Sequence, residues 1–142
     1  VTYLKRVQMI RINFQEFFCL LSLQALSCKT KTAEAVMQRS IKKLRRERSE
    51  FARMKANFYE GIQMARSPVA GMDVYARELL VAAKAKAEEL RLTPFVLAAG
   101  DELKWLEDIN QPSDLEAYLA DQGVVAPSRF ARLYRGVERP EA

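Results

Sequence analysis

The most regular hydrophobic pattern of the chain runs through residues 33–66. This segment contains no proline, and Gly61 is its only glycine. Alternate steps of four and three residues from Met37 meet apolar side chains at seven of nine positions, which we call the seam. The spacing predicts one long helix of about 50 Å that needs a partner to cover its apolar side. The seam positions are Met37, Ile41, Leu44, Arg48, Phe51, Lys55, Phe58, Ile62 and Ala65.

Residues 67–71 separate this long helix from the next one. Their sequence, Ser-Pro-Val-Ala-Gly, breaks a helix because proline lacks a backbone donor and glycine permits a turn. The apolar and alanine positions of residues 72–92 then resume a helical period. We therefore predict an antiparallel helical hairpin whose second arm, 72–92, is too short to cover the whole seam of 33–66.

The N-terminal segment is predicted to be one amphipathic helix, about 4–26, with Phe14, Phe17 and Phe18 packed on the long helix. Its basic start followed by an apolar run also fits a secretory signal, and the alternation over 10–14 also fits a strand. The uninterrupted apolar stretch is far shorter than the ~20 residues that a membrane-spanning helix needs, so no membrane segment is expected.

Proline, serine and glycine divide the rest of the chain into short helices. Ser113-x-x-Glu116 is a capping box, in which a serine and a glutamate side chain bond the free amides at a helix start. Gly100 is expected to split the helix that opens at Thr93-Pro94. The predicted helices cover 93–100, 101–109, 114–122 and 129–135, with Gly136 ending the last one.

Together these patterns predict an all-α protein, a long antiparallel helical hairpin with an N-terminal amphipathic helix and a small C-terminal lobe of short helices. Two domains are predicted. Residues 1–92 form a basic helical hairpin, similar to a coiled coil, and residues 93–142 form the small lobe.

Charge adds a functional hint to this architecture. The net charge is +5, but residues 1–66 carry 14 Lys and Arg against 5 Asp and Glu, whereas residues 67–142 carry 9 against 13. Such an excess favours binding of a polyanion or an acidic partner, although a solvated helix surface has a similar composition. The basic residues on or beside the seam in this region are Lys42, Lys43, Arg45, Arg46, Arg48 and Arg53.

Other residue types exclude several classes of site. The chain has no histidine, so histidine-based catalytic triads and zinc sites are excluded. On a helix, Cys19 and Cys28 would lie about 13 Å apart along the axis, too far for a disulfide, and both are expected to be buried in a cytoplasmic protein. No phosphate-binding glycine loop is present. No metal or cofactor is therefore expected.

Carboxylates of the C-terminal half are the only candidates for acid–base chemistry. We expect most of them on solvent-facing helix surfaces or at helix starts, where the helix dipole favours anions, and therefore predict no enzymatic activity. They are Asp101, Glu102, Glu107, Asp108, Asp114, Glu116 and Asp121.

Residues 123–136, Gly-Val-Val-Ala-Pro-Ser-Arg-Phe-Ala-Arg-Leu-Tyr-Arg-Gly, followed by Pro140, carry a family resemblance. This stretch resembles the turn and recognition helix of Cro/cI-type helix-turn-helix repressors, and the resemblance spans about residues 100–140. It departs from that pattern by one extra residue before Arg-Gly and by Asp114 in the place of a glutamine. The resemblance implies DNA contacts by Arg129, Arg132 and Arg135. The competing interpretation is a helical lobe whose core contains Phe130, Leu133 and Tyr134.

Two functions follow from these patterns. The first is a non-enzymatic nucleic-acid-associated regulator that dimerises or binds a protein partner through the 33–66 helix. Its phosphate contacts would be Lys42, Lys43, Arg45, Arg46, Arg53, Arg129, Arg132 and Arg135. The alternative is a helical protein-interaction module, such as an inhibitor, an adaptor or an assembly subunit, without nucleic-acid contact.

Overall fold

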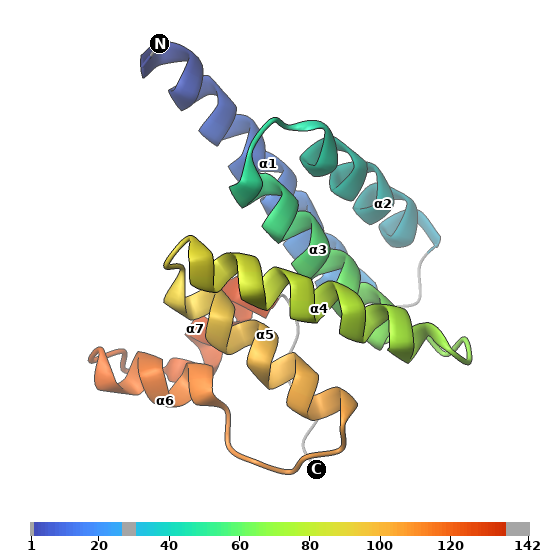
Figure 1. Ribbon diagram of the computed structural model, residues 1–142, viewed down its shortest axis with the longest axis vertical. Coiled ribbons are helices and arrows are strands. Elements are labelled where there is room, and N and C mark those ends of the chain that lie inside the picture. Colours follow the sequence, from blue (N-terminus) through green and yellow to red (C-terminus); the bar gives the residue numbers. More distant parts are fainter. Residues whose placement is uncertain (1, 27–30, 136–142) are drawn as a thin grey trace.

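The computed structural model describes residues 2–26 and 31–135, and this part of the chain is helical without strands (Figure 1). The all-α prediction is confirmed, and so is a continuous helix over the N-terminal segment. The helices are α1 (Thr2–Leu26), α2 (Lys31–Arg46), α3 (Glu50–Ala65), α4 (Met72–Glu89), α5 (Thr93–Leu106), α6 (Asp114–Asp121) and α7 (Pro127–Arg135).

The predicted single helix over 33–66 is wrong, because the chain turns back between α2 and α3. Ser49 has an extended backbone and caps α3, its hydroxyl accepting a hydrogen bond from the Ala52 amide at 3.4 Å. Serine is a favoured N-cap because it satisfies an amide that has no partner within the helix. Contacts between Gln38 and Gln63, 2.6 Å apart, and between Arg45 and Asn57, 2.8 Å apart, show that α2 and α3 run antiparallel.

This fold-back buries the seam within the chain. Met37 and Leu44 of α2, and Phe58 and Ile62 of α3, are fully buried. Helix α3 lies at the centre, packed against α1, α2, α4 and α5 (Figure 1). The apolar seam residues are thus buried or half-buried by other helices of the same chain, and of the seam positions only Arg48 is exposed.

Helices α3 and α4 form the tightest pair of the fold. They run antiparallel, with Gly61 of α3 beside Ala76 and Leu80 of α4. A Cβ atom at position 61 would lie 2.8 Å from the Leu80 Cγ, so only glycine allows this approach. Residues 66–71 join the two helices, as the helix-breaking sequence predicts. Within residues 33–66, the second arm of the predicted hairpin thus pairs with α3, and it also packs against α5.

Helix α1 buries one side and exposes the other. Ile12, Cys19 and Leu23 are fully buried, whereas Phe14 and Phe17 are 58% and 55% exposed. The prediction that Phe14 and Phe17 pack on the 33–66 segment is therefore wrong, whereas Phe18 is half-buried. At about 100° per residue Phe14 and Phe17 lie on the side of α1 opposite the buried residues, which already fill the contact.

Helix α5 runs without interruption through Gly100, so the predicted separate helix at 101–109 is wrong. A glycine within a helix costs only about 1 kcal/mol, and here buried residues on both sides of it outweigh that cost. Ala98 and Ala99 precede the glycine and Asp101 follows it, all at most 1% exposed. Pro94 lies in the first turn, as predicted.

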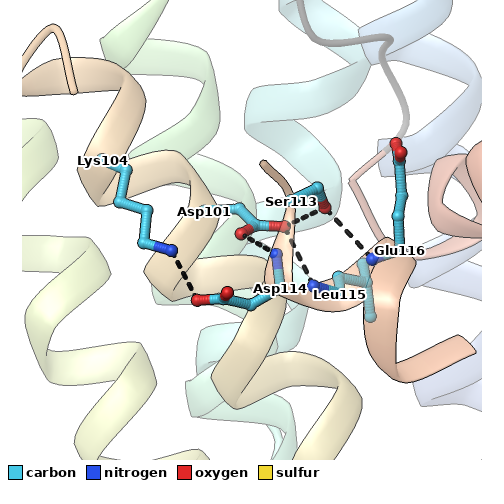
Figure 2. A network of polar contacts seen from close by, with 6 residues as sticks. All are labelled: Asp101, Lys104, Ser113, Asp114, Leu115 and Glu116. Atoms are coloured by element: carbon cyan, nitrogen blue, oxygen red, sulfur yellow. Dashed lines mark hydrogen bonds and ion pairs between the residues drawn. The ribbon is translucent and has the colours of Figure 1, made fainter. Parts of the chain in front are cut away.

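Asp101 fixes the start of α6 (Figure 2). Its carboxylate accepts hydrogen bonds from the Ser113 hydroxyl at 2.5 Å and from the amides of Asp114 and Leu115 at 2.9 and 3.3 Å. The Ser113 oxygen in turn accepts a hydrogen bond from the Glu116 amide at 3.1 Å, which confirms the predicted serine cap. A carboxylate from α5 therefore joins the serine in satisfying the free amides of α6.

Helix α7 closes the described part of the chain after a turn at Gly123, which has a positive φ of 82°. Ala131 is buried and Tyr134 packs edge-on against Phe95 of α5, with ring centroids 5.5 Å apart. Phe130 is exposed, as is Leu133, so the interpretation that these two fill a small core is wrong. One connected group of buried side chains runs from α1 to α7. The domain boundary at residue 92 stays a prediction, and Cys28 and Gly136 lie outside the described residues.

Candidate nucleic-acid interface

The outward side of α2 carries a compact group of cations. Arg39, Lys42, Lys43 and Arg46 are all exposed, and their spacings of three, four and seven residues place them on one side of the helix. The opposite side carries the buried seam residues that hold α2 against α1 and α3. We call these four residues the α2 basic face. It extends over about 10 Å at 1.5 Å per residue.

The α2 basic face is electrostatically unbalanced. None of its four side chains forms an ion pair with another residue that the structure describes. Four positive charges within two helical turns repel one another, so binding of an anion relieves part of their repulsion. Arg39 was not among the residues that sequence reasoning selected. Arg39 precedes Arg46 by seven residues, and this spacing in the sequence places both on the same side of a helix.

Arg45 and Arg53, which were also predicted to contact phosphate, do not belong to the α2 basic face. Arg45 turns toward α3, where its guanidinium donates to the Asn57 side chain at 2.8 Å and pairs with Glu60. Arg45 therefore stabilises the α2–α3 contact. Arg53 is exposed on α3, one turn before Asn57 and on the same side of that helix. Arg53 could extend the positive surface, whereas Arg45 is already engaged.

The predicted C-terminal contacts do not join this face. Arg129 and Arg132 are exposed on α7, and the side chain of Arg135 lies outside the described residues. Helix α7 packs against α5, α6 and α1, whereas α2 packs against α1 and α3 (Figure 1). The structure thus places the α2 basic face and the arginines of α7 on separate parts of the molecule. Helices α5, α6 and α7 lie where the repressor resemblance expects helices, but the helix-turn-helix assignment stays a prediction.

The acidic residues of α5 have structural partners. Asp101 and Glu102 are only 1% and 2% exposed, so the expectation of solvent-facing positions is wrong for them. Glu102 accepts two hydrogen bonds from the Arg66 guanidinium, at 2.9 and 3.2 Å, and this guanidinium also lies over the Trp105 ring. These carboxylates are buried because α5 turns this side toward α3 and α6. Asp114 at the start of α6 is exposed, and Lys104 pairs with it (Figure 2).

A second buried polar centre joins α1 to α3. The Lys55 ammonium pairs with Glu16, and the Tyr59 hydroxyl donates to the same carboxylate at 2.8 Å. Burial lowers the pKa of Lys55, and the neighbouring Glu16 opposes this shift. The ammonium also lies 4.2 Å from the centre of the Phe51 ring, a favourable cation–π distance. Lys55 occupies a seam position, and a charged residue at such a position indicates in the sequence that a buried ion pair is needed.

The same centre keeps nearby groups protonated. Burial, and secondarily the charge of Glu16, raises the pKa of Cys19 from 9.0 to about 12. Burial also raises the pKa of Tyr59 well above its ordinary value. Because the thiolate is the reactive form of cysteine, Cys19 is inert at neutral pH. Its burial confirms the expectation of a small apolar core residue.

In the described part of the chain, no three side chains of the metal-ligating types His, Cys, Asp and Glu come together as a metal site. None of the described helices is long and apolar enough to cross a membrane. Comparisons with protein-family models, with curated proteins and with solved structures found no match.

Proposed function

We propose that this chain is a non-enzymatic, cytoplasmic regulatory protein that associates with nucleic acid through the α2 basic face. The observation that carries the proposal is the group of four exposed cations, which have no ionic partner among the described residues. Such a group is the electrostatic signature of a phosphate-binding surface.

The recognition that this face supports is contact with the phosphate backbone. Lys42 and Lys43 provide compact charges for single phosphates, and the planar guanidinium groups of Arg39 and Arg46 can each bond two phosphate oxygens. The face is about as long as the major groove of DNA is wide, roughly 12 Å. It therefore fits across one strand or along a groove wall. Contacts of this kind give affinity without reading a sequence.

Helix α7 is a candidate for a second contact. Arg129 and Arg132 are exposed there, and arginine is the side chain that most often reads guanine. Because α7 is separate from α2, the two surfaces would contact different segments of one nucleic acid or two different molecules. Sequence preference, if present, would then depend on α7 and general affinity on α2.

Fluorescence anisotropy of a labelled duplex tests the role of α2. The double variant Lys42→Gln/Lys43→Gln removes two phosphate contacts and should reduce the magnitude of the log–log salt slope by about 1.8, at ~0.9 per contact. Arg77→Gln/Arg91→Gln is the matched control, because it removes two exposed cations of other regions. The control should leave the slope unchanged. Equal losses in both variants would mean a response to net charge alone and would overturn the assignment.

The alternative, a protein-interaction module without nucleic-acid contact, has a different observation in its favour. The outward side of α1 exposes Phe14, Phe17 and other large apolar residues. Absence of duplex binding at about 50 mM salt, where phosphate contacts are strong, would favour this alternative over the first function.

A further inference from the structure

Helix α1 carries a second row of apolar side chains, on the side that faces away from the core. We call this row the outer stripe. Its members alternate by four and three residues, which is the heptad spacing of packed helices. Five of the six are between 45% and 76% exposed, and Val7 is half-buried. The outer stripe consists of Tyr3, Val7, Ile10, Phe14, Phe17 and Leu21.

The outer stripe is surplus to the fold of a single chain. The opposite side of α1, with Ile12, Cys19 and Leu23, already supplies its contacts with the core. The stripe runs about 27 Å along the helix, at 1.5 Å per residue. Contiguous exposed apolar surface of this extent marks an interaction site rather than an ordinary surface.

We propose that the outer stripe binds the outer stripe of a second copy of this chain, in an antiparallel homodimer. The spacing is self-complementary in that orientation. Tyr3 faces Leu21 of the partner subunit, Ile10 faces the partner's Phe14, and the two-fold axis passes near residue 12. Each apolar residue of one copy thus meets an apolar residue of the other.

Charge selects the antiparallel orientation. Lys5 and Arg6, both exposed, lie at one end of α1. Arg6 lies beside the outer stripe, so a parallel pair would place it next to its copy, whereas an antiparallel pair places the two Arg6 side chains at opposite ends. Arg11, near the middle, is already paired with Glu47 at 3.0 Å. Glu16, the only acid of α1, is engaged with Lys55 on the core side.

The available area is sufficient for a specific dimer. Aromatic side chains bury about 150–250 Å² each, and Tyr3, Phe14 and Phe17 still expose more than half of theirs. With Ile10 and Leu21 added, each copy contributes on the order of 500 Å². Two copies then bury roughly 1,000 Å², the lower limit for a specific interface.

A second copy fits this surface better than a lipid bilayer does. Helices that lie in a membrane interface have one apolar side and one charged side that stays in water. From Ile12 to Leu23 the side of α1 opposite the outer stripe is instead buried in the protein core, and the exposed cations of α1, Lys5, Arg6 and Arg11, all precede this stretch. The dimer does not depend on nucleic-acid binding, because the α2 basic face belongs to a different helix.

Sedimentation equilibrium tests the dimer. The wild-type chain should show twice its mass of 16.2 kDa at micromolar concentrations, and Phe14→Glu/Phe17→Glu should show the single mass. Both positions are exposed, so the variant should keep its helical circular dichroism and its unfolding midpoint. The matched control is Val74→Glu/Tyr75→Glu on α4, whose residues are equally exposed but lie outside the stripe. The control should remain dimeric.

Three outcomes would overturn the proposal: a monomeric wild type at about 100 µM, a dimer that the stripe variant leaves intact, and a dimer that both variants disrupt equally. Vesicles containing phosphatidylserine identify the competing occupant. A monomer that binds them through Phe14 and Phe17 would assign the stripe to a membrane surface.

Cross-linking tests the orientation. In a Cys28→Ser background, an equal mixture of Tyr3→Cys and Leu21→Cys chains should form disulfides between the two variants. Neither variant alone should cross-link. Efficient cross-linking of Tyr3→Cys with itself would show a parallel pair and contradict the antiparallel arrangement.

Discussion

The α2 basic face and the interior of the helical bundle hold charge in opposite ways. On α2, Arg39 and Lys42 are exposed and have no ionic partner among the described residues. Inside, Lys55 and Asp101 are almost fully buried, and each is held by several groups of neighbouring helices. The comparison shows that a charge inside fixes how helices pack, whereas a charge outside is available to a ligand. Counts of charged residues do not separate these two roles.

Removal of the Glu16 charge should have the largest effect on stability. Glu16→Gln leaves the Lys55 ammonium buried without an anion, and breaking a buried pair in this way costs about 3 kcal/mol or more. Urea unfolding followed by circular dichroism measures the loss. The control is Glu47→Gln, whose partner Arg11 is 60% exposed, and it should cost less than about 1 kcal/mol. If both variants lose a similar free energy of unfolding, buried and exposed ion pairs do not differ in their contribution to the fold.

Removal of the Asp101 carboxylate should come next. Asp101→Ala abolishes three hydrogen bonds and leaves two amides at the start of α6 without their carboxylate partner. We expect a loss of about 2–3 kcal/mol in the free energy of unfolding, measured with urea. Asp121→Ala, at an exposed position in α6, should stay within about 0.5 kcal/mol of the wild type. If Asp101→Ala costs as little as Asp121→Ala, the hydrogen bonds of Asp101 shown in Figure 2 do not stabilise the start of α6.

The Cys19 thiol should make stability depend on alkaline pH. Its pKa is raised from 9.0 to about 12 in the fold, so between these values the unfolded chain releases the proton and the folded chain keeps it. Stability therefore falls as the pH rises through this window, by up to about 1.4 kcal/mol per pH unit. Urea unfolding of reduced protein at pH 8, 9 and 10 should show a shallower decline for Cys19→Ala than for the wild type. If the free energy of unfolding falls equally with pH in the wild type and in Cys19→Ala, the Cys19 thiol does not cause the pH dependence.

Neutralisation of the α2 basic face should have the smallest effect on stability. Lys42→Gln/Lys43→Gln changes exposed side chains without described ionic partners, so the free energy of unfolding should stay within about 0.5 kcal/mol of the wild-type value. Its thermal unfolding midpoint should likewise match. A clear loss of stability would mean that these lysines belong to the fold, and the comparison between inside and outside would fail.

Hydrophobic periodicity predicted most helices and the buried seam, but it could not detect the turn between α2 and α3. The same alternation of four and three continues across Ser49, so the period alone predicts one helix. The charged Arg48 at a seam position was the visible irregularity. Ser113 was recognised as a cap because Glu116 completes the capping box, whereas Ser49 has Ala52 in that place.

The position of charged and aromatic side chains was harder to predict than the helices. Helix α1 is apolar on two opposite sides, so its sequence does not show which side meets the core. The prediction placed Phe14 and Phe17 on the core side, whereas the structure places them on the outer side. Burial of Asp101 depends on the packing of α5 against α6, which no local pattern specifies. The cations of α2 were found because one side of the helix is apolar and the other basic, except for Arg39.

The most direct test of the account is the salt dependence of duplex binding by the wild-type chain. If the four cations of the α2 basic face each contact a phosphate, the log–log slope should be about −3.6, and affinity should fall about 150-fold between roughly 50 and 200 mM salt. Fluorescence anisotropy of a labelled random duplex measures both values. No binding at about 50 mM salt, or binding that salt does not weaken, would contradict the proposed function.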